Sequence, residues 1–249
     1  MYLTEPRLTD VVKKQLSHKL SAYSGAFNSL LVMQLIAILL GFSTGGGGSS
    51  NGGTLTIDYS YSTGDTSLIF TFLWALSTGA LITTAAYRND AFSLVSNRIS
   101  HNISSFLFLL FASAIGGVLA ALAGSIIKFT SLLQNNALFL ESSGLFSSPA
   151  DFFVRILTSV LYTILFAALG YMAGSFIQRS KLIIPLLIAA LFVLPQLGLN
   201  IGGVDLIARI IAFFGTETSL LVFLAKVVVS ICIFFAVSIT VTNKMEVRK

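Results

Sequence analysis

Six long stretches of the chain contain no charged residue, and they limit what it can fold into. These stretches cover residues 20–57, 66–87, 99–127, 156–178, 182–204 and 227–243. A helix needs about 20 mainly apolar residues to cross a hydrocarbon core of roughly 30 Å at 1.5 Å per residue. Each stretch therefore has room for one membrane-spanning helix. The apolar runs are continuous rather than alternating, which disfavours a transmembrane β-barrel.

We predict an all-α integral membrane protein with six transmembrane helices in a single domain. Charged residues make up 10% of the 249 residues, whereas a soluble domain carries roughly a quarter. The domain would consist of a cytoplasmic interfacial segment (1–24), the six spans (25–241) and a cytoplasmic tail (242–249). We expect the spans at Gly25–Phe42, Ser67–Tyr87, Ile103–Ile127, Phe153–Phe176, Leu182–Leu199 and Ser219–Val241.

The distribution of basic residues predicts the orientation of these spans. Eleven of the 15 Lys and Arg residues lie in segments that would face one side, and cytoplasmic loops carry such an excess. Both termini are therefore expected in the cytoplasm. The net charge of +5 does not indicate nucleic-acid binding, because most of the chain has no basic face in water. No cleavable signal peptide is evident, so the first span is expected to stay as an anchor.

Three segments outside the spans have recognisable patterns. Between Leu8 and Leu20, apolar residues recur at steps of three and four, which predicts an amphipathic helix along the cytoplasmic interface. Its residues of interest are Lys13, Lys14, Leu16 and Lys19, with the lysines near anionic headgroups. Residues 45–53 are glycine-rich without the Lys that a phosphate loop needs, and are interpreted as a flexible outer linker. Residues 204–214 are too short to cross and are expected to be re-entrant or interfacial on the outer face.

The spans contain no catalytic constellation and no metal-ligand cluster. His18 and His101 lie far apart in sequence, and Cys232 has no His in its span. We expect neither a catalytic residue nor a cofactor in this chain. Lys226 is the one ionisable residue well inside a predicted span, where it could contact an anionic substrate, hold a gate shut through Glu217 or Asp205, or simply reach the outer headgroups.

Small residues recur on two predicted spans, at Gly117, Ala121 and Gly124 on the third and at Gly170 and Gly174 on the fourth. Gly170 and Gly174 form a GxxxG pattern, which lets helix backbones approach closely in a membrane. We interpret this pattern as a packing surface rather than a substrate path.

This arrangement resembles the permease subunits of type-2 ABC exporters. The resemblance covers nearly the whole chain and is carried by the interfacial helix, the six spans, the short segment before the last span, and residues such as Ala86-Tyr-Arg-Asn-Asp-Ala-Phe-Ser-Leu-Val-Ser-Asn-Arg98. The small, Phe-rich chain is similar to bacterial exporters for amphipathic or antimicrobial peptides and for immunity against them.

The resemblance implies partners and a site. The region from Arg88 to Asn102 would be a coupling helix that docks on a separate cytosolic ABC ATPase, present in two copies, which would bind ATP and Mg²⁺. Its residues of interest are Arg88, Asp90, Phe92, Leu94, Val95 and Arg98. A second permease chain, identical or not, would complete the path in the bacterial plasma membrane. Gln34, Phe70 and Trp74 are candidates for the path, with core packing as the alternative for each.

Two other interpretations remain open at this stage. A stand-alone secondary transporter or channel would normally show buried acidic residues or paired halves with broken helices. A non-transporting membrane assembly protein would also be compatible with the basic inner loops.

Overall fold

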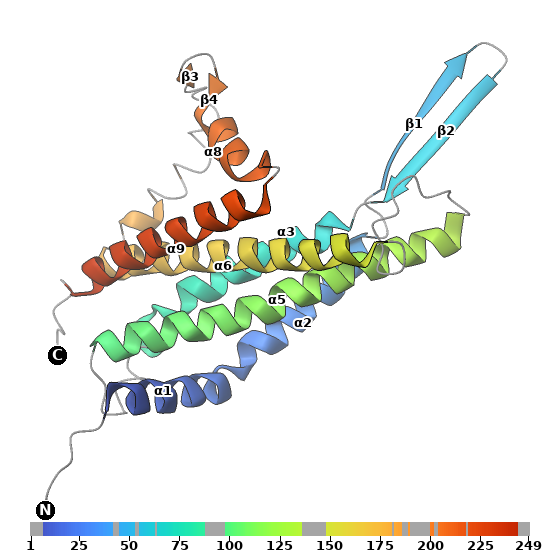
Figure 1. Ribbon diagram of the computed structural model, residues 1–249. Helices are drawn as coiled ribbons and strands as arrows, with labels where there is room; N and C mark the ends of the chain where they lie inside the picture. Colours follow the sequence, from blue (N-terminus) through green and yellow to red (C-terminus); the bar gives the residue numbers. More distant parts are fainter. Residues whose placement is uncertain are drawn as a thin grey trace, which may run out of the picture.

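The computed structural model describes residues 7–41, 45–52, 55–62, 64–87, 98–135, 148–180, 182–185, 189, 200–201, 204–217 and 219–243. Most of these residues are helical (Figure 1). The longer helices are α1 (Leu8–Ala22), α2 (Ser24–Gly41), α3 (Asp65–Ile82), α5 (Arg98–Asn135), α6 (Pro149–Arg179), α8 (Leu206–Gly215) and α9 (Leu220–Asn243). Two short hairpins join them, one of β1 (Gly45–Gly52) with β2 (Leu55–Ser62), the other of β3 (Asn200–Ile201) with β4 (Val204–Asp205).

Five helices are long and apolar enough to cross a membrane. They are α2, α3, the Ile99–Ile127 part of α5, α6, and α9 as far as Thr242. The prediction of a helical, multi-pass membrane protein is confirmed at this level, and five of the six predicted spans coincide with these helices. The predicted span Leu182–Leu199 lies, except for residues 182–185 and 189, outside the described residues. At 38 residues, or roughly 57 Å, α5 is longer than a bilayer crossing requires.

Helices α3, α6 and α9 run in the same direction. The ring of Tyr162 on α6 packs against Phe223 on α9 with centroids 4.9 Å apart, and farther along both helices Tyr171 stacks on Phe235 at 5.0 Å. Because the residue numbers rise together, α6 and α9 are parallel. On α3, Phe72 stacks on Phe166 of α6 at 4.7 Å, and the later residue Ala80 meets Gly174, so α3 is parallel to α6 as well.

Helices α2 and α5 run the opposite way. Gln34, late in α2, bonds to Thr71 of α3, while Ala26, early in α2, accepts a bond from the later α3 residue Trp74. On α5 and α6 the early residue Asn102 accepts a bond from the later residue Tyr171. The end of the bundle where α1 lies is called the α1 end below, and the end where α8 joins α9 is called the α8 end (Figure 1).

The broadest helix contact in the described residues joins α3 and α6. A Cβ atom on Gly170 would collide with the backbone carbonyl of Leu76, and one on Gly174 would lie 2.8 Å from the Cα of Ala80. Gly79 of α3 faces the carbonyl of Ala167 in the same way. Such close contacts are possible only where a side chain is missing. Gly170 and Gly174, which we expected to serve packing, therefore lie at a helix contact, and Gly79 completes it.

The glycine-rich segment forms a strand rather than the flexible linker that we expected. Gly45 pairs with Ser62 and Gly52 with Leu55 in an antiparallel hairpin that extends past the bundle (Figure 1). The expectation was wrong because it considered the glycines alone. The partner sequence from Leu55 to Ser62 alternates apolar or aromatic with polar residues, as strands do, and glycine retains the backbone groups that a ladder requires.

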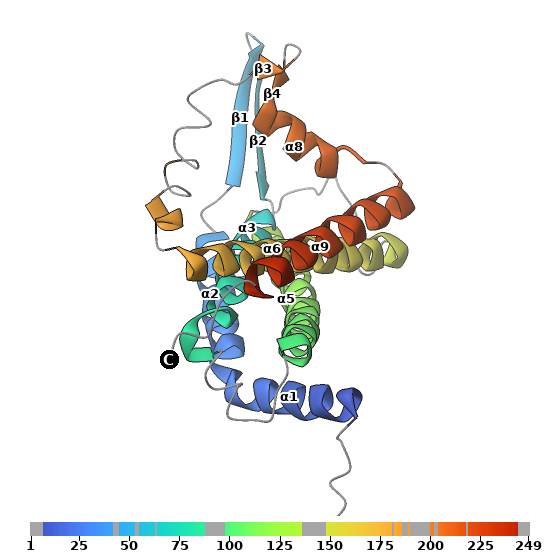
Figure 2. The same cartoon turned by 90° about the vertical axis from the view of Figure 1, so that its left-hand side faces the viewer.

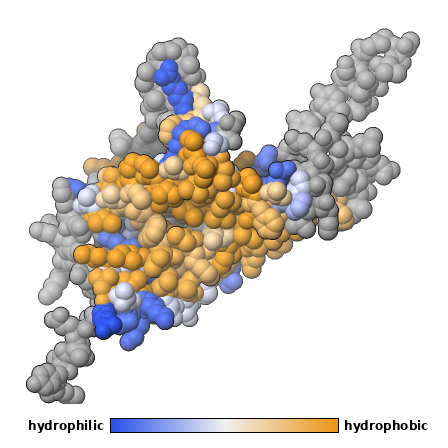
Figure 3. All heavy atoms as spheres, viewed as in Figure 1, coloured by the Kyte–Doolittle hydropathy of each residue, from blue (hydrophilic) through white to orange (hydrophobic). Residues whose placement is uncertain are grey.

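Large apolar side chains cover the outside of the bundle as well as its core. Figure 3 shows a broad hydrophobic band across the helices, with hydrophilic patches near the two ends. Exposed apolar residues include Leu31, Leu35 and Leu39 on α2, and Leu221, Val229 and Ile233 on α9. An apolar surface of this extent suits lipid rather than water.

Helix α1 lies across the ends of α2 and α5 (Figure 2). Lys13 and Lys14 are exposed, as expected of an interfacial helix, and Leu16 is half-buried against the core. The buried stripe nevertheless differs from the predicted apolar stripe. It consists of Val12, Gln15 and Lys19, whereas the apolar Leu8 is 49% exposed.

The prediction that Lys19 faces lipid headgroups is wrong. Its side chain is 1% exposed, and its Nζ donates hydrogen bonds to α5, at 3.2 Å to the carbonyl of His101, 2.8 Å to Ser104 Oγ and 2.7 Å to Ser105 Oγ. These acceptors lie more than 80 residues away in the sequence, so a local helical pattern does not reveal them.

Candidate functional site

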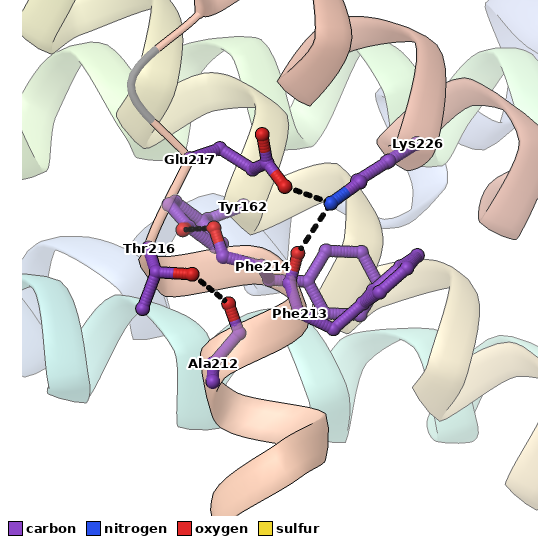
Figure 4. A network of polar contacts seen from close by, with 7 residues as sticks. All are labelled: Tyr162, Ala212, Phe213, Phe214, Thr216, Glu217 and Lys226. Carbon is purple, nitrogen blue, oxygen red and sulfur yellow. Dashed lines mark hydrogen bonds and ion pairs between the residues drawn. The ribbon is translucent and has the colours of Figure 1, made fainter.

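The α8 latch joins the end of α8 to α9 and α6, at the α8 end of the bundle (Figure 4). We define it as Tyr162, Phe213, Phe214, Glu217 and Lys226. Lys226 Nζ donates to the carbonyl of Phe213 at 3.1 Å, forms an ion pair with Glu217, and lies 4.2 Å from the centre of the Phe213 ring. The lysine therefore contacts a carboxylate, a carbonyl and an aromatic face together, two of them through the same residue of α8.

The latch also caps the C-terminus of α8. The last carbonyls of a helix have no partner within the helix, and they form the negative end of its dipole. Tyr162 Oη of α6 donates to the carbonyl of Phe214 at 2.8 Å, and Thr216 donates to Ala212 through its backbone N–H at 3.1 Å and its hydroxyl at 2.7 Å. Lys226 adds a positive charge at this negative end.

The side chains of Lys226 and Glu217 are 21% and 25% exposed. Water therefore reaches the ion pair and weakens it relative to a fully buried pair. An ion pair of this kind can hold α8 against the bundle and can still break to release it. Gln34 and Trp74, in contrast, lie within the bundle.

Aromatic rings support the latch from inside the bundle. Tyr162 lies 6.0 Å from Phe72 of α3 and 4.9 Å from Phe223 of α9, measured between ring centres. This packing fixes the ring whose hydroxyl caps α8. The sequence did not single out Tyr162, because a tyrosine in the middle of a span gives no sign of the carbonyl 52 residues later that its hydroxyl reaches.

Gln34 and Trp74, two of the path candidates, connect α2 to α3. Gln34 is 6% exposed, and its Nε2 donates to Thr71 Oγ1 at 2.6 Å, while its Oε1 is buried without a hydrogen-bond partner. Trp74 is 3% exposed, and its Nε1 donates to the carbonyl of Ala26 at 3.0 Å and to Ser29 Oγ at 3.1 Å. Phe70 is half-buried. Within this single chain, Gln34 and Trp74 therefore stabilise the contact between α2 and α3.

The structure brings together only part of the predicted site. Lys226 meets Glu217, one of the two partners that we considered for a gate, and the side chain of Asp205 lies outside the described residues. The coupling residues Arg88, Asp90, Phe92, Leu94 and Val95 also lie outside them, and Arg98 is the first residue of α5. Among the residues that the structure describes, no three His, Cys, Asp or Glu side chains come together as a metal ion would require.

Replacing Lys226 with Met is expected to loosen α8. The change removes the donor to Phe213 and leaves Glu217 without its cation, at an expected cost of about 1 kcal/mol for a partly exposed contact. Maleimide labelling of an Ala212→Cys reporter, in a Cys232→Ser background, should then be roughly fivefold faster. Glu217→Gln is the matched control, because it leaves the bond from Lys226 to Phe213 and should show a smaller increase. Equal labelling of the Lys226→Met variant and its parent would contradict the latch.

Comparison with known proteins adds no family to this picture. No family model, no curated protein and no solved structure matches the chain.

Proposed function

We propose that this chain is the transmembrane subunit of an ATP-driven ABC exporter in a bacterial plasma membrane. It would supply half of a path for amphipathic peptides or similar hydrophobic compounds, and a separate cytosolic subunit would hydrolyse ATP. A second permease chain would form the other half.

The parallel course of α6 and α9 is the observation that carries this proposal. If both helices cross the membrane in the same direction, the chain must return across it between Arg179, where α6 ends, and Leu220, where α9 begins. A return crossing there makes six spans and puts both termini on one side, which is the topology of the family that the sequence resembles. The return falls in the interval that contains the charge-free stretch 182–204.

The ends of the described helices carry charges that favour the α1 end as cytoplasmic. Lys13, Lys14 and Arg179 are exposed there, whereas Asp65 and Asp151 are exposed in the first turns of α3 and α6 at the opposite end. The basic residues at the α1 end are what the positive-inside rule describes, and the acidic residues at the opposite end add little to it. On this orientation, the connection between α3 and α5 would lie on the cytoplasmic side, where an ATPase could bind it.

The acidic residues of the spans argue against an ion-coupled secondary transporter. In the described spans, Asp and Glu occur only as Asp65 and Asp151, both within the first turns of their helices. A proton or sodium pathway usually places a carboxylate deeper in the membrane. An energy source outside this chain is therefore the better-supported interpretation.

Purification from native membranes tests the proposal. The tagged chain should bring down a cytosolic ATPase of roughly 250 residues that carries a phosphate-binding loop. Alanine at Phe92, Leu94 and Val95 together should abolish that association, because it removes the apolar surface of the coupling segment. The control carries alanine at Leu31, Leu35 and Leu39, which are exposed apolar residues of α2.

Two outcomes would contradict different parts of the proposal. If the ATPase still binds the triple variant at Phe92, Leu94 and Val95, the coupling segment is assigned wrongly. If the purified chain moves cargo with no ATPase present, the exporter proposal itself is wrong.

A further inference from the structure

The contact between α1 and α5 is held by polar groups that are almost completely buried. We define the Lys19 clamp as Gln15 and Lys19 of α1 with four residues of α5, which are Ser100, His101, Ser104 and Ser105. Gln15 Nε2 donates to Ser100 Oγ at 3.3 Å, and Ser104 Oγ donates to Gln15 Oε1 at 3.1 Å. With the three bonds from Lys19, five hydrogen bonds tie α1 to the first two turns of α5.

No described carboxylate takes part in this contact. The three partners of Lys19 are a backbone carbonyl and two hydroxyls, so its charge meets dipoles but no opposite charge. Moving an ammonium out of water without a counter-ion is costly, and a lysine can avoid that cost by losing its proton. Burial accordingly lowers the pKa of Lys19 from 10.5 to about 7.

Among the residues that the structure describes, no neighbouring group could supply a negative charge to Lys19 at neutral pH. His101 of α5 lies in the same contact, and Tyr171 of α6 donates to Asn102 of α5 close by. The other titratable and charged groups of the described α1 segment are Arg7, Asp10, Lys13, Lys14, His18 and Tyr23, and Tyr87 lies beyond α3. Asp10 is exposed in the first turn of α1, more than two helical turns before Lys19. The loop with Arg88 and Asp90, and the side chain of Arg98, lie outside the described residues.

We propose that the Lys19 clamp is a protonation-controlled lock, which holds α1 on α5 when the Lys19 amine is neutral and releases α1 more readily when the ammonium forms. Release returns the side chain to water, where the charged form is well solvated. The clamp joins α1 to the first two turns of α5, so the state of Lys19 decides whether α1 moves together with this end of α5. The lock itself does not depend on the proposed exporter function.

The direction of the pH effect follows from proton linkage. In released α1 the lysine has its ordinary pKa of 10.5, whereas burial in docked α1 lowers the pKa to about 7. Between these two pKa values the released form binds more protons than the docked form. Each rise of one pH unit therefore increases the equilibrium constant for docking by up to about tenfold. Below about pH 7 both forms are protonated, and docking should no longer change with pH.

Cysteine labelling in membrane vesicles, with no ATPase present, tests this lock. Val12 is buried against the bundle, so a Val12→Cys reporter in a Cys232→Ser background reacts with a soluble maleimide only when α1 is released. Ser17→Cys, on the exposed side of the same helix, corrects for the effect of pH on the thiol itself. The ratio of the Val12→Cys rate to the Ser17→Cys rate should fall by more than tenfold between pH 7 and pH 9.

Variants of the lysine separate the lock from a general effect of pH. Lys19→Met should make the ratio independent of pH, while Lys14→Met, which changes an exposed lysine on the same helix, should keep the dependence of the parent. Lys19→Arg retains its charge throughout this range and should leave the Val12→Cys reporter reactive at both pH values. A parent ratio that does not change between pH 7 and pH 9, or the same change in Lys19→Met, would overturn the proposal even if one variant failed to fold.

Discussion

Replacing Gly170 with Leu should destabilise the bundle by at least about 3 kcal/mol. The new Cβ would collide with the carbonyl oxygen of Leu76 and lie 2.9 Å from its Cα, and backbone atoms of a helix cannot move aside as a flexible side chain can. Helices α3 and α6 would have to separate, and they would lose dispersion contacts along their whole shared length.

Denaturation in detergent measures this loss. Trp74 of α3 is the only tryptophan of the chain and is buried against α2. Its fluorescence therefore follows the separation of these helices. Gly25→Leu is the matched control, because nothing lies within 4 Å of a Cβ at that position. A Gly170→Leu variant as stable as Gly25→Leu would show that α3 and α6 do not pack as described.

Replacing Trp74 with Ala should cost about 3 kcal/mol or more. The indole fills the space beside Gly116, and its N–H donates to the carbonyl of Ala26 and to Ser29 Oγ on α2. The change to Ala therefore leaves a cavity and removes the donor from both acceptors. Trp74→Phe keeps most of the ring and should lose about 1 kcal/mol, the usual net value of a hydrogen bond.

This series separates packing from a role in a substrate path. Circular dichroism during detergent denaturation measures stability without the tryptophan, and Leu73→Ala, at an exposed neighbouring position, serves as control. A path residue would behave differently, because Trp74→Ala would then change cargo export and leave the unfolding transition in place. An unchanged transition in Trp74→Ala would therefore contradict the packing role.

The sequence predicts the helices better than their contacts. Apolar stretches without charges locate α2, α3, α5, α6 and α9, because a bilayer requires roughly 20 such residues wherever a helix crosses. Gly170 and Gly174 could be recognised from their spacing alone. Gly79, which faces the same contact from α3, has no second glycine four residues away, so the GxxxG pattern does not reveal it.

Lys19 shows why polar contacts are harder to predict than spans. An amphipathic pattern assigns lysines to the wet side of a helix, and Lys13 and Lys14 follow that rule. Lys19 departs from it because Ser104 and Ser105 of α5 offer acceptors from a distant part of the chain. The α8 latch has the same origin, since Tyr162 and Lys226 cap carbonyls that are defined only after α8 has folded against α6 and α9.

The side of the membrane that each end of the bundle faces tests the central claim most directly. Single cysteines at Ser93, Ala150 and Ser219, in a Cys232→Ser background, can be labelled in intact cells with a reagent that does not cross membranes. A chain with six crossings and parallel α6 and α9 predicts that Ala150→Cys and Ser219→Cys react from outside, whereas Ser93→Cys reacts only after the membrane is opened. Reaction of Ser93→Cys from outside, or of Ala150→Cys and Ser219→Cys from opposite sides, would contradict the account.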